Sequence, residues 1–150
     1  MASFRSRYEQ RRTIRTGQRP QQLPSVAPPM AMLGLLGAQF LLGMAVNLFV
    51  QLPPSGAAMA AMMSGNPLVP LHMMLGMLLG VGAVLAVVLA LSGGRAVIGF
   101  AALALGGIVI AGVGGLTFLF GGHDNSASFL MSVGFLVAVG GYVGELAYLR

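Results

Sequence analysis

Four long apolar runs dominate the chain, and polar residues are concentrated in the segments between them. The runs cover residues 30–52, 68–91, 96–120 and 127–149, and each has 23 to 25 residues. At about 1.5 Å per residue, a helix of this length crosses about 30 Å of hydrocarbon. None of the runs alternates as a barrel strand does, and in lipid a helix satisfies its own backbone groups. The pattern predicts an all-α membrane protein with four transmembrane helices.

The segments between the runs are short, which favours an up-and-down order of the helices. Ser92-Gly93-Gly94 forms one tight turn, residues 121–126 form a second, and residues 53–66 form a longer connection. Short connections place consecutive helices side by side and antiparallel. We therefore expect residues 30–150 to form an antiparallel four-helix transmembrane bundle, preceded by a basic tail over residues 1–29.

In this predicted topology, all the basic residues fall on the same side of the membrane. Arg95 lies between the second and third runs and Arg150 follows the fourth. The other six precede the first run: Arg5, Arg7, Arg11, Arg12, Arg15 and Arg19. An excess of arginine or lysine marks the cytoplasmic side of a membrane. The distribution predicts a multi-pass protein with both termini in the cytoplasm.

Composition narrows the classes of partner. Only 7% of the residues are charged and 57% are apolar, so the chain has too few charges to cover a water-facing surface. The net charge of +5 comes mainly from the tail, which suits anionic lipid headgroups. The tail lacks the interleaved aromatic residues on which bases stack, so nucleic acid is not an expected partner. The absence of cysteine excludes disulfides, thiolate metal sites and cysteine nucleophiles.

Small residues recur four positions apart within the runs. A spacing of four places residues on one helix face, where small side chains allow close approach of another helix. Two interpretations stay open, namely packing within the bundle and contact with another subunit or a second copy. The residues that mark these faces are Gly107, Ala111, Gly115, Gly140 and Gly144.

The predicted topology gathers a group of polar residues at the outer end of the bundle: Asn47, Gln51, His72, His123 and Asp124. One hypothesis is haem b, with His72 and His123 as axial ligands and Asp124 orienting a ring. The alternative is that His72 hydrogen-bonds a neighbouring helix while His123 caps a turn. Gln39, deeper in the first run, is also expected to hydrogen-bond a neighbouring helix.

Methionines near His72 raise a rival hypothesis. Thioether and imidazole groups suit Cu(I), although methionine more commonly fills apolar space. Copper is therefore a weaker alternative to haem. The methionines concerned are Met59, Met62, Met63, Met73, Met74 and Met77.

Glu145 is the only acid within a run, about one turn from the cytoplasmic end. It is either an interfacial carboxylate near Arg150 or a proton- or cation-coupled site of a small transporter. Tyr142 and Tyr148 are expected to anchor the same interface. No set of nucleophile, base and orienting group can be assembled, so no catalytic residue is predicted.

Several short stretches carry a resemblance to a known kind of protein: 115–120, 126–131, Tyr142, 47–49, 71–72 and 75–76. In these the chain resembles small four-span bacterial integral membrane proteins without an assigned activity. The resemblance implies a location in the bacterial inner membrane and a fold, but no chemistry. The leading hypothesis is a non-catalytic subunit or scaffold of a larger membrane complex. The alternatives are a haem b electron carrier using His72 and His123, or a small transporter using Glu145.

Overall fold

The computed structural model describes residues 25–50, 65–120 and 125–150. These segments contain four α-helices and no strand, namely α2 (Ala27–Phe49), α4 (Leu68–Ala90), α5 (Arg95–Phe120) and α6 (Asn125–Leu149). Each helix is long and apolar enough to cross a membrane. The all-helical prediction is confirmed for the described segments, and most of the basic tail lies outside them.

The first two helices begin where the local sequence supplies a suitable start. Helix α2 begins at Ala27, earlier than the expected residue 30, because Pro28 and Pro29 fit its first turn. Proline lacks an N–H group, and the first-turn N–H groups have no partner within a helix. At the start of α4, the side-chain oxygen of Asn66 accepts a hydrogen bond from the Leu68 N–H at 2.9 Å. This bond satisfies one of the free amides at that helix end.

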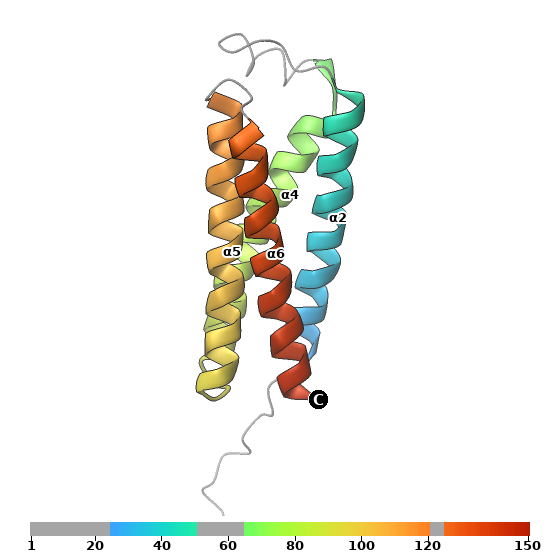
Figure 1. The fold of residues 1–150 in the computed structure, drawn as a ribbon. Helices are drawn as coiled ribbons and strands as arrows, with labels where there is room; N and C mark the ends of the chain where they lie inside the picture. Colours follow the sequence, from blue (N-terminus) through green and yellow to red (C-terminus); the bar gives the residue numbers. More distant parts are fainter. Residues whose placement is uncertain (1–24, 51–64, 121–124) are drawn as a thin grey trace, which may run out of the picture.

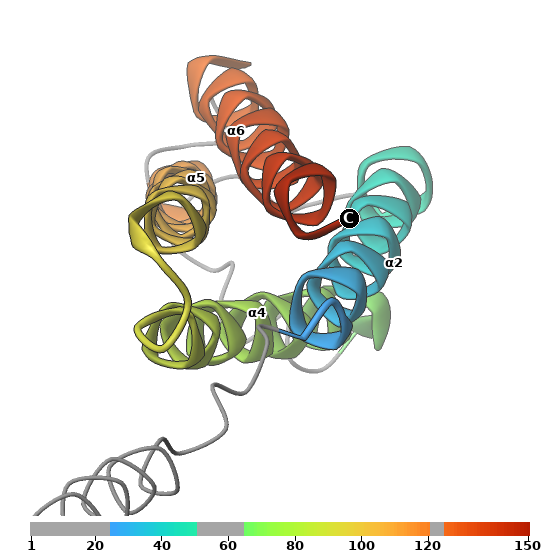
Figure 2. The ribbon, with the colours of Figure 1, turned by 90° about the horizontal axis from the view of Figure 1, so that it is seen from below.

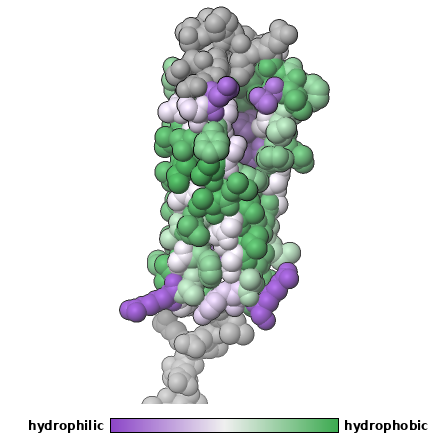
Figure 3. Space-filling model, viewed as in Figure 1, coloured by the Kyte–Doolittle hydropathy of each residue, from purple (hydrophilic) through white to green (hydrophobic). Residues whose placement is uncertain are grey.

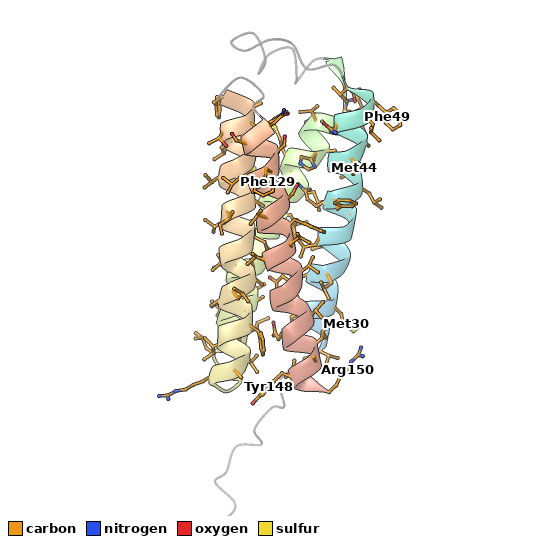
Figure 4. The ribbon with its side chains drawn as sticks, in the orientation of Figure 1. Met30, Met44, Phe49, Phe129, Tyr148 and Arg150 are labelled. Atoms are coloured by element: carbon orange, nitrogen blue, oxygen red, sulfur yellow. The ribbon has the colours of Figure 1, made fainter. Side chains whose placement is uncertain are left out.

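Consecutive helices run in opposite directions, as the colours in Figure 1 show. Seen along its length, the bundle forms a ring in which α2 contacts α4, α4 contacts α5, α5 contacts α6 and α6 contacts α2 (Figure 2). One end of the bundle therefore carries the start of α2, the turn between α4 and α5, and the C-terminus. Met30 and Arg150 lie at this end in Figure 4, and Phe49 lies at the other. We call these the C-terminal end and the opposite end.

The sides of the bundle are apolar and its two ends are more polar, as Figure 3 shows for one face. Large hydrophobic side chains point outward from all four helices, including Leu41, Met77, Leu116 and Leu136. Water-soluble monomers rarely expose large contiguous apolar patches. The surface thus agrees with the length and composition of the helices in indicating a membrane protein.

Small residues dominate the contact between α5 and α6. A Cβ atom added at Gly107 would lie 2.6 Å from the Gly134 carbonyl oxygen, and one at Gly141 would lie 2.7 Å from the Ala104 amide nitrogen. One at Gly114 would lie 2.8 Å from the Met131 amide nitrogen. The glycines on each helix are seven residues apart, Gly107 and Gly114 on α5 and Gly134 and Gly141 on α6. These positions let the two backbones approach more closely than any side chain would permit.

The five small residues named from the sequence have different surroundings. Gly107 and Ala111 lie at the α5–α6 contact, where a Cβ on Gly134 would come against the Ala111 backbone. A Cβ on Gly115 would be in ordinary contact with Met131, at 3.7 Å from the sulfur. Gly144 faces the ring of Phe100. A Cβ on Gly140 would meet no atom within 4 Å in the described structure. Gly107 and Ala111 therefore keep the expected spacing of four at this contact, alongside the seven-residue spacing of the glycines.

Candidate functional site

Two pairs of polar side chains lie between the helices, at different heights in the bundle. Gln39 of α2 and His72 of α4 form the first pair. Tyr142 and Glu145, one turn apart on α6, form the second. Each pair contains buried polar atoms without a hydrogen-bond partner in the described part of the chain. Such atoms are uncommon in proteins and call for an explanation, so these pairs are the candidate sites.

Gln39 and His72 meet across the contact between α2 and α4. The Gln39 Nε2 atom lies 3.3 Å from the His72 Nε2 atom. In this arrangement the amide donates to the imidazole. If the amide oxygen and nitrogen exchange places, the imidazole donates to the amide instead. When the amide donates, His72 Nδ1 and Gln39 Oε1 are the atoms left buried without a partner among the described residues.

Two glycines make room for this pair. A Cβ on Gly43, one turn after Gln39 on α2, would lie 3.1 Å from the His72 Cε1 atom. A Cβ on Gly76, one turn after His72 on α4, would lie 3.2 Å from the Gln39 Nε2 atom. Each polar side chain thus extends over a glycine of the facing helix. The arrangement joins α2 and α4 by a hydrogen bond, as expected for Gln39 and as in one of the two alternatives for His72.

The haem hypothesis requires both histidines. His123 lies outside the described residues, together with Asp124 and Gln51. His72 points its Nε2 atom at Gln39, within the contact of two helices, rather than at an open slot. The remaining member of the expected outer polar group, Asn47, is exposed on α2. Within the described residues, His72 therefore meets Gln39, which is not a member of the expected group. The grouping of the other four residues stays a prediction.

The methionines near His72 on α4 face outward. Met74 and Met77 are exposed by 68% and 73%, and Met73 is also exposed. Met59, Met62 and Met63 lie outside the described residues. Across residues 25–50, 65–120 and 125–150, no group of three or more histidine, cysteine or acidic side chains could hold a metal ion. The copper hypothesis gains no support from the arrangement of α4.

Tyr142 and Glu145 occupy the face of α6 that is turned into the bundle. Tyr142 is fully buried, and Glu145 has only 5% of its surface exposed. The Tyr142 hydroxyl and the Glu145 Oε2 atom have no hydrogen-bond partner in the described segments. Tyr142 is therefore a core residue rather than the expected interfacial anchor. Tyr148, by contrast, is exposed at the C-terminal end (Figure 4).

The inward position of Glu145 follows from the pattern of small residues on α6. Ala127, Gly134, Ala138 and Gly141 are buried at spacings of seven, four and three, and Glu145 continues this series at a spacing of four. Such spacing keeps residues on one helix face that packs against a neighbour. The expected position of Glu145 rested on its distance from the helix end and from Arg150. The series of small residues was the signal that could have placed it in the interior.

Taken together, the fold and the two polar pairs define a small helical protein with four candidate membrane spans. The chain matches no protein-family model, no curated protein and no solved structure. The resemblance to four-span bacterial membrane proteins stays a prediction.

Proposed function

We propose that this protein is a non-catalytic subunit or scaffold that binds other membrane proteins through outward-facing glycines. The observation that carries the proposal is the set of helical glycines whose added Cβ would meet no atom within 4 Å in the described structure. These are Gly34, Gly37, Gly80, Gly99, Gly106, Gly112 and Gly140. We call the exposed members on α5, Gly99, Gly106 and Gly112, the outer glycine face.

Glycine is a poor choice for a helix surface that only meets lipid. It has a lower helix propensity than alanine by about 1 kcal/mol per residue, and it offers no side chain for packing. In membrane helices, glycine permits close helix–helix contact. Helix α5 uses Gly107 and Gly114, seven residues apart, against α6. Gly99 and Gly106 repeat that spacing on an exposed part of α5, which supports a second helix contact there.

The polar pairs do not favour an enzyme. Catalysis of group transfer needs a nucleophile, a base and an orienting group within reach of one another. His72 lies near the opposite end of the bundle and Gln39 near the middle of α2, whereas Tyr142 and Glu145 lie toward the C-terminal end. A structural role for the first pair, holding α2 against α4, agrees with the subunit proposal.

For the setting of this subunit we propose the bacterial inner membrane, with both termini in the cytoplasm. Arg95 begins α5 and Arg150 follows α6, so both belong to the C-terminal end of the bundle. An excess of arginine marks the cytoplasmic side. The six arginines of the tail then meet the anionic headgroups of the same leaflet.

Purification in mild detergent with identification of bound proteins tests the proposal. We expect partner proteins, or further copies of this chain, at fixed stoichiometry. Gly106→Leu should release them without lowering the melting temperature of the isolated chain, because Gly106 is exposed and a Cβ there would meet no atom within 4 Å. Val84→Leu, at an exposed position of α4 that already carries a branched side chain, is the matched control.

Two results would contradict the subunit proposal. One is a chain that purifies alone in mild detergent and in lipid nanodiscs. The other is complete retention of the partners by Gly106→Leu and by the double variant Gly99→Leu/Gly106→Leu. An absorption spectrum of the same sample tests the haem alternative: we expect no Soret band, and a stoichiometric band lost on His72→Leu would favour the electron carrier.

A further inference from the structure

The Glu145 side chain is enclosed by the bundle, and the described residues form no ion pair with its carboxyl group. Its Oε2 atom is buried and accepts no hydrogen bond from the described residues. Tyr142 lies three positions earlier, on the same face of α6. Its hydroxyl is also buried without a partner among those residues. One turn of α6 therefore holds two polar groups with unused hydrogen-bonding capacity.

The helices packed against α6 bring no titratable group into the interior beside Glu145. Helix α2 contains none, and the only one on α5 is Arg95, which is exposed at its first position. On α4 the only one is His72, near the opposite end of the bundle. Two further titratable residues come after Glu145 in the chain, Tyr148 in the last turn of α6 and Arg150 just after it, and both are exposed.

The groups that do surround this turn of α6 are apolar. A Cβ on Gly141 would contact Ala104, and one on Gly144 would contact the ring of Phe100. Ala101 and Ala104 of α5 are fully buried. An ionised carboxylate in such surroundings loses its hydration and gains little in return. The site therefore calls for an occupant that cancels the charge.

A proton is the occupant that these surroundings accommodate. A hard metal cation takes about six to eight oxygen ligands. At this turn of α6, the buried side-chain oxygens among the described residues belong to one carboxyl group and one phenol. A proton needs no cavity and no ligand shell, and it turns the carboxylate into a neutral group. We infer that Glu145 is an intramembrane proton-binding site, with Tyr142 as its polar neighbour.

The position of Glu145 also indicates where its proton exchanges. The residue is four positions before Leu149, the last residue of α6, so it lies about 6 Å from the helix end at about 1.5 Å per residue. Water at the C-terminal end is therefore the source and the acceptor of the proton. This inference does not depend on the proposed subunit role, since it requires no partner protein.

A hydrophobic carbodiimide tests the inference on the full chain in lipid vesicles. The reagent takes up the proton of a neutral carboxylic acid while the carboxyl oxygen bonds to its central carbon, and rearrangement leaves a stable N-acylurea. We expect mass spectrometry to find this adduct on the peptide that contains Glu145. Its rate of formation should fall roughly tenfold per pH unit once the carboxyl group ionises, as for a single proton site.

Variants of Glu145 and Tyr142, together with competition by a metal cation, test whether this site binds a proton. Glu145→Gln should abolish the adduct and keep the melting temperature, since the amide is neutral as the protonated acid is. The infrared carbonyl band of a protonated carboxylic acid should be present in the wild type, shift in Glu145→Asp and vanish in Glu145→Gln. Tyr142→Phe should keep the adduct and change the midpoint of its pH profile.

Three outcomes would overturn the inference. The first is a wild-type protein with neither the adduct nor the infrared band at any pH at which it stays folded. The second is protection of Glu145 by Na⁺ or K⁺ at constant pH, which would assign the site to a metal cation. The third is a pH profile identical in wild type and Tyr142→Phe, which would remove Tyr142 from the site.

Discussion

Gly107 of α5 and Gly134 of α6 face each other so closely that neither position has room for a methyl group. A Cβ on Gly107 would lie 2.6 Å from the Gly134 carbonyl oxygen, and one on Gly134 would lie 2.5 Å from that of Gly107. The obstacle on both sides is backbone, which cannot rotate away as a side chain can. This contact fixes the spacing of α5 and α6 and, through α6, the position of Tyr142 and Glu145.

The first prediction concerns Gly134. Gly134→Ala should lower the free energy of unfolding by about 1–3 kcal/mol, as overpacking does in a closely packed core. Gly140→Ala, on the same helix but with no atom within 4 Å of its Cβ, is the control. Gly140→Ala should leave the free energy of unfolding unchanged or raise it by up to about 1 kcal/mol, because alanine has the higher helix propensity. Thermal unfolding in detergent checks both variants, and equal melting temperatures would contradict the described contact.

The second prediction compares a glycine whose added Cβ would meet a side chain with one whose added Cβ would meet backbone atoms. A Cβ on Gly144 would lie 2.6 Å from the Cε1 atom of the Phe100 ring. Gly144→Ala should therefore destabilise the wild type but be nearly neutral in a Phe100→Leu background, because the smaller side chain clears the space. Gly134→Ala should show no such rescue by Ala111→Gly, since its obstacle is the α5 backbone. Melting temperatures of the single and double variants check this, and additivity in the Gly144 pair would refute it.

The third prediction concerns the hydrogen bond between Gln39 and His72. A double-mutant cycle with Gln39→Leu and His72→Leu should give a coupling energy of about 0.6 kcal/mol and at most about 1.7 kcal/mol, as for other hydrogen bonds between membrane helices. Asn47→Leu combined with His72→Leu should be additive, because Asn47 is exposed on α2. Unfolding in a denaturing detergent provides the energies. Equal coupling in both cycles would mean that the Gln39–His72 contact contributes nothing specific.

The helices could be predicted from the sequence because length and hydropathy decide whether a segment can span lipid. The expected starts at residues 68 and 96 and the observed starts at Leu68 and Arg95 nearly coincide. The start of α2 differs more, at Ala27 instead of residue 30, because the helix includes Pro28 and Pro29 in its first turn.

The partners within the candidate sites could not be predicted, because they depend on helix rotation and relative height. Counting from helix ends placed His72 with Asn47, whereas it meets Gln39, which lies more than two turns from the end of α2. Such counting assumes that the ends of neighbouring helices are level. It also says nothing of which face turns inward, so it left open whether Glu145 is an interfacial carboxylate near Arg150 or a coupled site of a transporter.

The threading of the chain through the membrane is the central claim, and single cysteines test it most directly because the natural chain has none. Ser92 is exposed in the turn between α4 and α5, and Asn125 is exposed at the start of α6, at the other end of the bundle. A membrane-impermeant maleimide should label Asn125→Cys on intact cells and Ser92→Cys only after permeabilisation. Labelling of Ser92→Cys on intact cells, or equal labelling of both variants without permeabilisation, would contradict the account.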